Sequence, residues 1–241
     1  MTITISHHRQ ILAYSVQKRP IEGVFFGPQT SVRLNTLFIG VFHGDEGNSA
    51  DLLSRLITHF QAGQFAGEAI DFEQRPVLVI PVLNPDGLVA KTRVNANHVD
   101  LNRNYPTPDW QVDNENTPYY SGPSPASEPE TRLVMSLIET YQPQKIITVH
   151  CPYRVINFDG PAQPLAEAMA VSSGYPVVAS IGYPTPGSFG TYAGVERHIP
   201  VVTLELPPNP DDVPDPELPP AESLDQNWQS NRMSLDDAIR F

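Results

Sequence analysis

The chain has 241 residues and a formal net charge of -12, from 15 Lys and Arg against 27 Asp and Glu. That length suits one large α/β domain, and the acidic balance argues against nucleic acids and anionic membranes, which need clustered Lys and Arg. The single cysteine, Cys151, cannot form an internal disulfide, which is typical of a reducing compartment. No basic start precedes an apolar stretch and no segment approaches membrane-spanning length, so we expect a cytoplasmic protein.

The first two apolar segments are short, at residues 11–17 and 21–26, and we expect them to pair as an antiparallel edge of a sheet. Longer β-branched runs follow and are typical of strands buried on both faces. These runs are residues 36–42, 77–83, 145–150 and 200–206. Because helical patterns alternate with them, we predict one α/β domain over residues 1–241, with a mixed, mostly parallel twisted sheet flanked by helices.

Two segments carry apolar side chains at the spacing of one helical stripe, at residues 50–60 and 133–141. The second helix is predicted to start within residues 127–130, Ser-Glu-Pro-Glu. There Ser127 can cap the first turn, Glu130 can return a bond three residues later, and proline suits a first-turn position.

Two stretches show no regular period. Residues 106–125 mix Pro, Asp, Asn, Ser and Gly with aromatic residues, which predicts an ordered loop with aromatic anchors. These anchors are Trp110, Tyr119 and Tyr120. Residues 207–220 are acidic and rich in proline, and we expect an extended surface segment there, followed by a short C-terminal helix near residues 221–238.

A histidine and a carboxylate stand three residues apart directly after the first buried run, because His43 and Glu46 follow residues 37–42. In a strand-to-helix turn the pair can present a nitrogen and an oxygen to one ion, and zinc accepts both ligand types. His150 ends the run 145–149 in the same way. Ligands at the ends of neighbouring strands meet in the crevice of an open α/β sheet, so His150 is the predicted third ligand. Two His and one Glu leave the fourth zinc position open for water, as in hydrolytic sites, and we expect one zinc ion per chain.

Two further features suit chemistry beside such an ion. Glu205 lies in an apolar strand, where an ionised group is costly unless it has a role, and acting as a base beside zinc is such a role. Residues 92–106 are dense in Arg and Asn, which suits binding of a carboxylate. Other interpretations stay open: Glu205 can face water from an edge strand, and His150 can be a hydrogen-bonded core residue. We expect Cys151 to be a buried apolar residue rather than a nucleophile.

Together these motifs resemble the zinc carboxypeptidase family, of which carboxypeptidase A is the type enzyme. The resemblance runs in order from His43 to Glu205 and covers most of the chain. The matching segments are the His-x-x-Glu pair, Asn84-Pro85-Asp86-Gly87, residues 93–106, Ser127-Glu128-Pro129-Glu130-Thr131, the strand-end His150 and Thr203-Leu204-Glu205-Leu206.

The resemblance implies roles for individual residues. The positions that match the zinc ligands of the family are His43, Glu46 and His150. Glu205 matches the general base, and Arg93 matches the arginine that stabilises the oxyanion. Asn102 and Arg103 match the pair that grips the terminal carboxylate of the substrate, and Asp100 matches the carboxylate that orients the first zinc histidine.

Two more positions concern the substrate pocket. Tyr183 lies at the spacing before the general base where the family has a mobile tyrosine that covers the substrate, with Tyr175 and Tyr192 as nearby alternatives. Asp45 stands where digestive members of the family carry a basic residue that touches the substrate. This exchange indicates a substrate with an amino group, which Asp45 would bind.

Within the family, the motifs look most like those of bacterial murein peptide amidases. That group cleaves the γ-D-glutamyl to meso-diaminopimelate bond of murein tripeptide during cytoplasmic recycling of the cell wall. The resemblance therefore implies a small peptide substrate and a pocket with both signs of charge, for which Arg154, Asp159 and Asp45 are candidates. A homodimer is implied by the resemblance alone.

Three other functions use similar residues. A zinc deacylase of the succinylglutamate desuccinylase or aspartoacylase type also has a His-x-x-Glu pair and a distant histidine, but the Asn-Pro-Asp-Gly run and the Glu-Pro-Glu-Thr helix start favour the carboxypeptidases. A zinc carboxypeptidase with another peptide specificity is a second alternative. A non-catalytic binding module is the third, and the presence of three ligands, a base and an arginine disfavours it.

Overall fold

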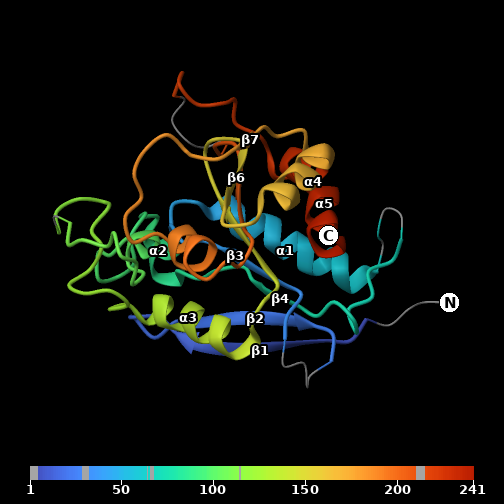
Figure 1. Ribbon diagram of the computed structural model, residues 1–241, viewed down its shortest axis with the longest axis horizontal. Helices are drawn as coiled ribbons and strands as arrows, with labels where there is room; N and C mark the ends of the chain where they lie inside the picture. The colour runs from blue at the N-terminus through green and yellow to red at the C-terminus, as the bar shows by residue number, and fades with distance from the viewer. Residues whose placement is uncertain (1–4, 29–32, 64, 66–67, 114, 210–214) are drawn as a thin grey trace.

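The computed structural model describes residues 5–28, 33–63, 65, 68–113, 115–209 and 215–241. These residues form an eight-stranded sheet with strand order β1-β2-β4-β3-β5-β8-β6-β7 (Figure 1). The strands are β1 (His7–Tyr14), β2 (Pro20–Phe26), β3 (Thr36–Gly40), β4 (Val77–Ile80), β5 (Lys145–His150), β6 (Val155–Asp159), β7 (Val177–Val178) and β8 (Val201–Glu205).

The four central strands, β4, β3, β5 and β8, run parallel to one another. Antiparallel strands flank them, because β2 pairs with β4 and β6 pairs with β8 in the opposite direction. The hairpin of β1 and β2 forms the predicted antiparallel edge, although β1 begins and ends earlier than expected. The predicted α/β class with a mixed, mostly parallel sheet is confirmed.

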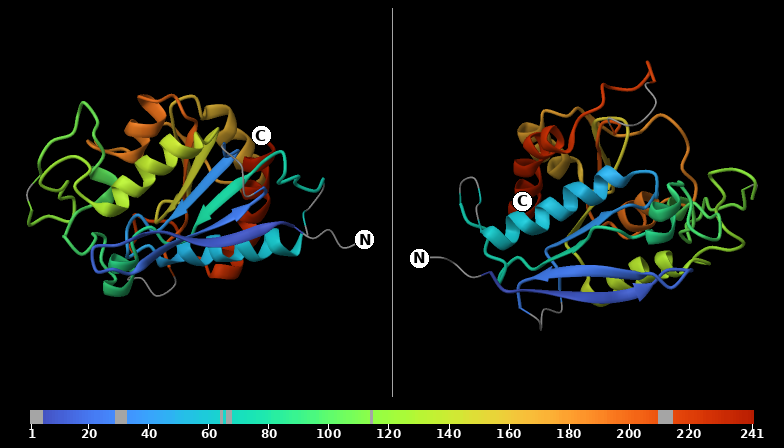
Figure 2. Two further views of the ribbon diagram at one scale, coloured as in Figure 1. Left: turned by 90° about the horizontal axis from the view of Figure 1, so that it is seen from below. Right: turned by 180° about the vertical axis from the view of Figure 1, so that it is seen from behind.

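Helices cover both faces of the sheet (Figures 1 and 2). They are α1 (Gly47–Ala62), α2 (Pro85–Ala90), α3 (Pro129–Tyr141), α4 (Gln163–Ser173) and α5 (Leu224–Arg240), with a 3-10 turn, η1 (Leu101–Arg103), and a π-helical turn, η2 (Gly190–Val195). One hydrophobic core lies between the sheet and α1, α4 and α5, and a second lies between the sheet and α3 and η2. Side chains of a strand alternate between the faces, so Phe38 enters the first core while Leu37 and Ile39 enter the second.

The start of α3 differs from the prediction. The helix begins at Pro129, as its first-turn position predicts, but the residue at the cap is Glu128 and no side chain caps the turn. The Ser127 hydroxyl donates instead to Glu128 Oε1 at 2.7 Å. Glu130 is fully buried and accepts a bond from Asn95 Nδ2 at 3.2 Å. The predicted capping box is therefore wrong, because both of its side chains bond to other groups nearby.

The two aperiodic stretches differ in outcome. Residues 106–125, apart from 114, form a loop without helix or strand, as predicted. In the stretch 207–220, Pro207 and Pro208 are buried, whereas residues 215–220 are exposed or partly exposed and form no helix or strand, as predicted. Residues 210–214 lie outside the described residues.

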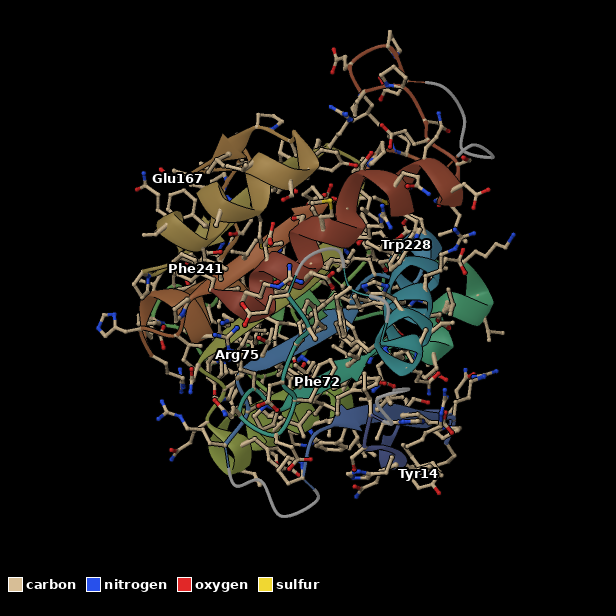
Figure 3. The ribbon with its side chains drawn as sticks, turned by 90° about the vertical axis from the view of Figure 1, so that its right-hand side faces the viewer. Tyr14, Phe72, Arg75, Glu167, Trp228 and Phe241 are labelled. Atoms are coloured by element: carbon tan, nitrogen blue, oxygen red, sulfur yellow. The ribbon has the colours of Figure 1, made fainter. Side chains whose placement is uncertain are left out.

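The predicted C-terminal helix is present as α5, and it begins and ends two to three residues later than the predicted range 221–238. Ser223 and Gln226 form a capping box at its start. In Figure 3 Trp228 of α5 lies beside α1, where its ring packs edge-on against His59 with centroids 5.4 Å apart. Among the described residues, no helix is long and apolar enough to cross a membrane.

Candidate active site

The turn after β3 is shaped by the segment that follows β4. Asn84 Nδ2 donates to the carbonyl of Phe42 at 3.3 Å, and the backbone N–H of Asn84 donates to the carbonyl of Val41 at 3.0 Å. A Cβ on Gly44 would lie 2.0 Å from the carbonyl carbon of Gly87, so only glycine fits there. Val41 itself has a φ of 52°, which β-branched residues rarely adopt. This forced turn directs the next side chains toward the end of β5.

Three side chains meet at that point: His43, Glu46 and His150. One ligand atom from each lies within 4.8 Å of the others, and all three residues are buried. His43 Nδ1 is 2.7 Å from Glu46 Oε1, and His150 Nδ1 is 2.9 Å from Glu46 Oε2. The structure therefore brings together the three residues that the sequence predicts as metal ligands.

The predicted base lies beside this cluster. His150 and Glu205 are the last residues of β5 and β8, and they are partners in the parallel ladder. Glu205 is 5% exposed, and its Oε2 atom has no hydrogen-bond partner among the described residues. Burial, together with the nearby Glu46 carboxylate, raises the pKa of Glu205 to about 8. A buried carboxyl group with a free oxygen and a pKa close to neutrality is suited to transfer protons in both directions.

Burial and the neighbouring charges shift the pKa values of all three residues of the cluster. Burial by itself would lower the pKa of His43, but the carboxylates of Glu46 and Asp100 raise it to about 9. Burial would raise the pKa of Glu46, whereas the two histidines lower it to about 2. Burial lowers the pKa of His150, and its contact with Glu46 offsets only part of this effect. The site is thus built around one ionised carboxylate that faces two imidazoles.

Asp100 connects the cluster to the neighbouring loop. Its Oδ1 atom lies 3.0 Å from His43 Nε2 and also accepts the backbone N–H of Asn102 at 2.8 Å. Its Oδ2 atom accepts from Arg93 Nε at 2.9 Å. The residue is fully buried, and despite this burial His43 and Arg93 hold the pKa of its carboxyl well below the usual range. One carboxylate therefore fixes a histidine, an arginine and the start of η1.

This arrangement fits a zinc ion. Because His43 Nε2 donates its proton to Asp100, Nδ1 of the same ring presents its lone pair toward Glu46. A lone pair and a carboxylate oxygen at 2.7 Å repel each other unless a second proton or a cation lies between them. Two imidazole nitrogens and a carboxylate are the donors that zinc takes in sites with an open fourth position.

A cavity of about 200 Å³ opens from the cluster. Besides the three clustered residues it is lined by Arg93, Asn102, Arg103, Tyr119, Cys151, Pro152, Tyr153, Asn157, Asp159, Ala179, Ser180, Ile181, Tyr183, Thr185, Ser188, Gly190, Thr203 and Glu205. Segments from the loops before and after η1 and from the 179–190 region meet here, at one end of the sheet (Figure 1). The cavity is therefore bordered on one side by the metal-ligand cluster and Glu205, and it has room for a small ligand.

The profile of the zinc carboxypeptidase family matches residues 5–164 of this chain. The chain belongs to the zinc carboxypeptidase family. It is therefore a zinc metallopeptidase or amidase, as the motifs predict. Murein peptide amidase A of Escherichia coli (strain K12) is 31% identical over 196 residues, which cover 77% of this chain and 76% of that protein. Murein peptide amidase A of Vibrio campbellii is 34% identical over 197 residues, covering 77% of this chain and 74% of that protein.

Solved structures agree with the sequence relatives. The crystal structure of murein-tripeptide amidase from Escherichia coli O157 superposes with a TM-score of 0.74 at 27% identity, covering 97% of this chain and 92% of that chain. Carboxypeptidase A from Helicoverpa armigera superposes with a TM-score of 0.77 at 17% identity, covering 98% of this chain and 69% of that chain. The second likeness shows the shared carboxypeptidase fold.

In this zinc carboxypeptidase some of the residues predicted to bind substrate line the cavity, and others lie away from it. Arg93, Asn102 and Arg103 line the cavity. Tyr183 also lines it, is 40% exposed, and hydrogen-bonds to Tyr153. The alternatives Tyr175 and Tyr192 are instead buried in the two hydrophobic cores. Of the three tyrosines, only Tyr183 is placed to reach a bound substrate.

Two candidates lie away from the cavity. Asp45 is exposed and faces a separate groove beside Asp51 and Lys91, because the turn directs it away from its neighbours His43 and Glu46. Arg154 pairs with Glu222 at 3.1 Å, with its guanidinium over the ring of Tyr175. Asp159, the remaining candidate, lines the cavity.

The prediction of the cavity missed several lining residues. Tyr119 was expected only as an anchor of the 106–125 loop, but its ring packs against Arg93 and Arg103, with guanidinium carbons 5.2 and 5.9 Å from its centroid. Tyr153 and Asn157 come from the region of β6, a strand that was not predicted from the sequence. The only early signal was the clustering of aromatic residues in the loop. Cys151 is buried and lines the cavity beside His150.

Proposed function

We propose that this protein is a zinc-dependent amidase that hydrolyses the γ-D-glutamyl to meso-diaminopimelate bond of murein tripeptide in peptidoglycan recycling. The observation that carries the proposal is the buried cluster of two histidines and one glutamate, with a buried carboxyl group beside it, at the mouth of a small charged cavity. The substrate follows from the similarity to proteins named murein peptide amidase A, which spans most of the chain.

We assign one zinc ion per chain to His43, Glu46 and His150. When bound, zinc supplies a Lewis acid for the scissile carbonyl and lowers the pKa of a coordinated water toward about 7. Asp100 holds the proton of His43 on Nε2 and so keeps Nδ1 available as a ligand. The protein contributes the rest of the mechanism through side chains that hold charge or move protons.

Glu205 is the proposed general base. Glu205 lines the cavity, and its Oε2 atom has no hydrogen-bond partner among the described residues, so this oxygen is available to take the proton of the attacking water. The same carboxyl group then gives the proton to the leaving amine, which restores the starting state. Arg93 is the proposed oxyanion partner, because Asp100 fixes its Nε atom and leaves the rest of the guanidinium beside the cavity.

Asn102 and Arg103 are the proposed grip for the carboxylate next to the new amine. The backbone N–H of Phe189 donates to Asn102 Oδ1 at 2.8 Å, which fixes the orientation of that amide. Arg103 is 5% exposed and donates to the carbonyl of Asn102 at 2.7 Å. Meso-diaminopimelate has a carboxylate at this position, so the grip suits it. Tyr183 is proposed to cover the bound substrate.

Asp45 was also expected to bind an amino group of the substrate. Its exposure in a separate groove does not support contact with a ligand in the cavity. We propose further that residues 1–241 act as one catalytic domain in the cytoplasm. A homodimer remains a proposal that sizing chromatography with light scattering would test.

The test is a substrate panel for the zinc-loaded protein. We expect murein tripeptide to release meso-diaminopimelate, detected by mass spectrometry, and N-acetylaspartate and N-succinylglutamate to be hydrolysed far more slowly. Preferred turnover of the N-acyl amino acids would support a deacylase instead. Preferred cleavage of ordinary α-linked C-terminal residues would indicate a carboxypeptidase of another specificity.

A further inference from the structure

Two acids at the start of α3 are buried, and the proposed mechanism does not use them. Glu128 is 2% exposed and Glu130 is fully buried. Both accept from Asn95 Nδ2, at 2.7 Å on Glu128 Oε2 and at 3.2 Å on Glu130 Oε2. Asn95 belongs to residues 93–104, here called the substrate loop, which carry the proposed oxyanion arginine and carboxylate grip. Buried carboxyl groups are costly without partners, so their contact with this loop indicates a role there.

Asn95 closes a tight turn in the first half of the substrate loop. Its Oδ1 atom accepts the backbone N–H groups of Asn97 at 3.0 Å and of Val99 at 3.1 Å. Its own backbone N–H donates to the carbonyl of Val99 at 2.9 Å. This segment, which we call the Asn95 turn, lies between Arg93 and Asp100 in the chain. The side chain and the backbone of one residue therefore set the path of the chain between the arginine and the acid that binds it.

The Glu128 carboxylate holds the Asn95 turn from outside. Its Oε2 atom accepts from Asn95 Nδ2 at 2.7 Å and from Asn97 Nδ2 at 2.8 Å. Its Oε1 atom accepts from Ser127 Oγ at 2.7 Å. These three donors are neutral, and a charged acceptor binds neutral donors more strongly than a neutral acceptor does. Glu128 therefore fixes two amide groups of the turn from a different segment of the chain.

The proposed carboxylate grip does not depend on the Glu128 side chain. Asn102 Oδ1 accepts the backbone N–H of Phe189 at 2.8 Å. Asn104 Oδ1 accepts the backbone N–H of Glu128 at 3.2 Å, a bond in which the Glu128 carboxylate takes no part. Loss of the carboxylate should therefore loosen the half of the loop that follows Arg93 and leave the half that carries the grip.

We propose that Glu128 is a positioning residue, which holds Arg93 in place through Asn95 and so sustains turnover more than substrate binding. The inference rests on the proposed function, in which Arg93 stabilises the oxyanion. The backbone of Arg93 precedes the Asn95 turn, and Asp100, which binds Arg93 Nε at 2.9 Å, follows it directly. Both attachments of the guanidinium therefore move with the turn. A displacement of about 1 Å at a reacting centre can cost about 100-fold in rate.

The test compares three variants of Glu128 in the zinc-loaded protein, with murein tripeptide as substrate. E128Q loses the charge but keeps one oxygen for both asparagine amides, with its NH₂ group toward Ser127 Oγ. E128D keeps the charge but is one methylene too short, and E128A removes the acceptor. We expect E128Q to keep kcat within about threefold, and E128D and E128A to lose at least about tenfold in kcat with KM within about threefold. Equal losses in E128Q and E128D, or a rise in KM at unchanged kcat, would overturn the proposal.

A double-mutant cycle tests whether Glu128 acts through Asn95. N95A should lower kcat at least as much as E128A, and the double variant should match N95A, because the effects of coupled residues do not add. Additive losses would overturn the route through Asn95. Asp236→Ala is the matched control, because it removes another buried acid, one that is bonded to His59 at 3.1 Å. The control should lower the melting temperature and leave kcat and KM unchanged. If E128A does not fold, E128D replaces it in the cycle.

Hydrogen exchange tests the same contacts without the reaction. The backbone N–H groups of Asn97 and Val99 are bonded within the Asn95 turn, so in zinc-loaded E128D they should exchange at least about tenfold faster than in the wild-type protein. The N–H groups of β5 should keep their exchange rates. If the wild-type protein cleaves no murein tripeptide, the proposed function fails, and the exchange rates still report whether Glu128 holds the turn. Unchanged exchange at both positions would overturn the role of Glu128 whatever the substrate.

Discussion

The substitution Asp100→Asn probes how one carboxylate organises the site. In the native protein, Asp100 Oδ1 accepts from His43 Nε2 at 3.0 Å and Oδ2 accepts from Arg93 Nε at 2.9 Å. An amide cannot serve both partners. With its oxygen on the histidine, its NH₂ group faces the N–H of Arg93. With the amide reversed, the NH₂ group faces Nε2 and favours the histidine tautomer that has its proton on Nδ1, the proposed ligand atom.

The expected magnitude follows from these alternatives. Loss of the partner that orients a ligating histidine weakens metal binding by about 10- to 100-fold, or about 1.4 to 2.7 kcal/mol. The misplaced Arg93 adds a loss of turnover, because its guanidinium no longer has a fixed partner. Without metal, the variant still loses one of the two hydrogen bonds and the negative charge that strengthens both, so its melting temperature should also fall.

The assay is competition for zinc against a chromophoric chelator, with thermal denaturation of metal-free protein measured in parallel. Asp236→Asn is a matched control, because Asp236 is a buried acid bonded to His59 at 3.1 Å between α5 and α1, far along the chain from the site. The control should lower the melting temperature and leave zinc affinity unchanged. If Asp100→Asn binds zinc as tightly as the wild-type protein, Asp100 does not orient His43.

Three further predictions follow from the same contacts. Glu205→Gln should keep zinc, measured by atomic absorption, and lose about 10²- to 10⁴-fold in kcat on murein tripeptide; a rate near wild type would refute the general base. Tyr119→Leu removes the ring that packs on Arg93 and Arg103 and should lower kcat/KM by about 5- to 30-fold. Tyr119→Phe retains the ring face, so its kcat/KM should stay near that of the wild type. Equal losses in the two variants would indicate that the hydroxyl is the important group. Burial lowers the pKa of Lys145 to about 8. At this site the folded protein therefore binds fewer protons than the unfolded chain, so the contribution of Lys145 to stability should rise as pH increases from about 8 to 10.5, by on the order of 1 to 2 kcal/mol after allowance for screening by solvent. Lys145→Met should stabilise the protein at pH 7 and flatten this rise in urea denaturation, and an unchanged pH dependence would contradict the assignment.

Features that depend on neighbouring residues could be predicted from the sequence. The three-residue spacing of His43 and Glu46 after a buried run places both in one turn, because local backbone geometry allows little else. Asn102 and Arg103 share a 3-10 turn with Asp100 at its cap for the same reason. The parallel strands were evident because burial on both faces requires continuous apolar runs.

Local patterns failed where a distant partner competed. Ser127 and Glu130 have the spacing of a capping box, but Asn95 from another loop binds Glu130. Asp45 lies between two proposed ligands in sequence, yet the forced turn at Gly44 directs its side chain away from the cavity. The spacing of residues does not report side-chain direction in an irregular turn, and so neither result could be predicted.

The sequence by itself determined the family, the fold class and the residues able to bind a metal, because short-range spacing and strand periodicity encode them. Only the tertiary structure decided which side chains complete the cavity. Tyr119 reaches the two arginines from an aperiodic loop, and Asp159 lines the cavity from a short, half-buried strand beside two glycines of η2. These contacts join segments far apart in the chain, and their energies depend on packing that no local pattern records.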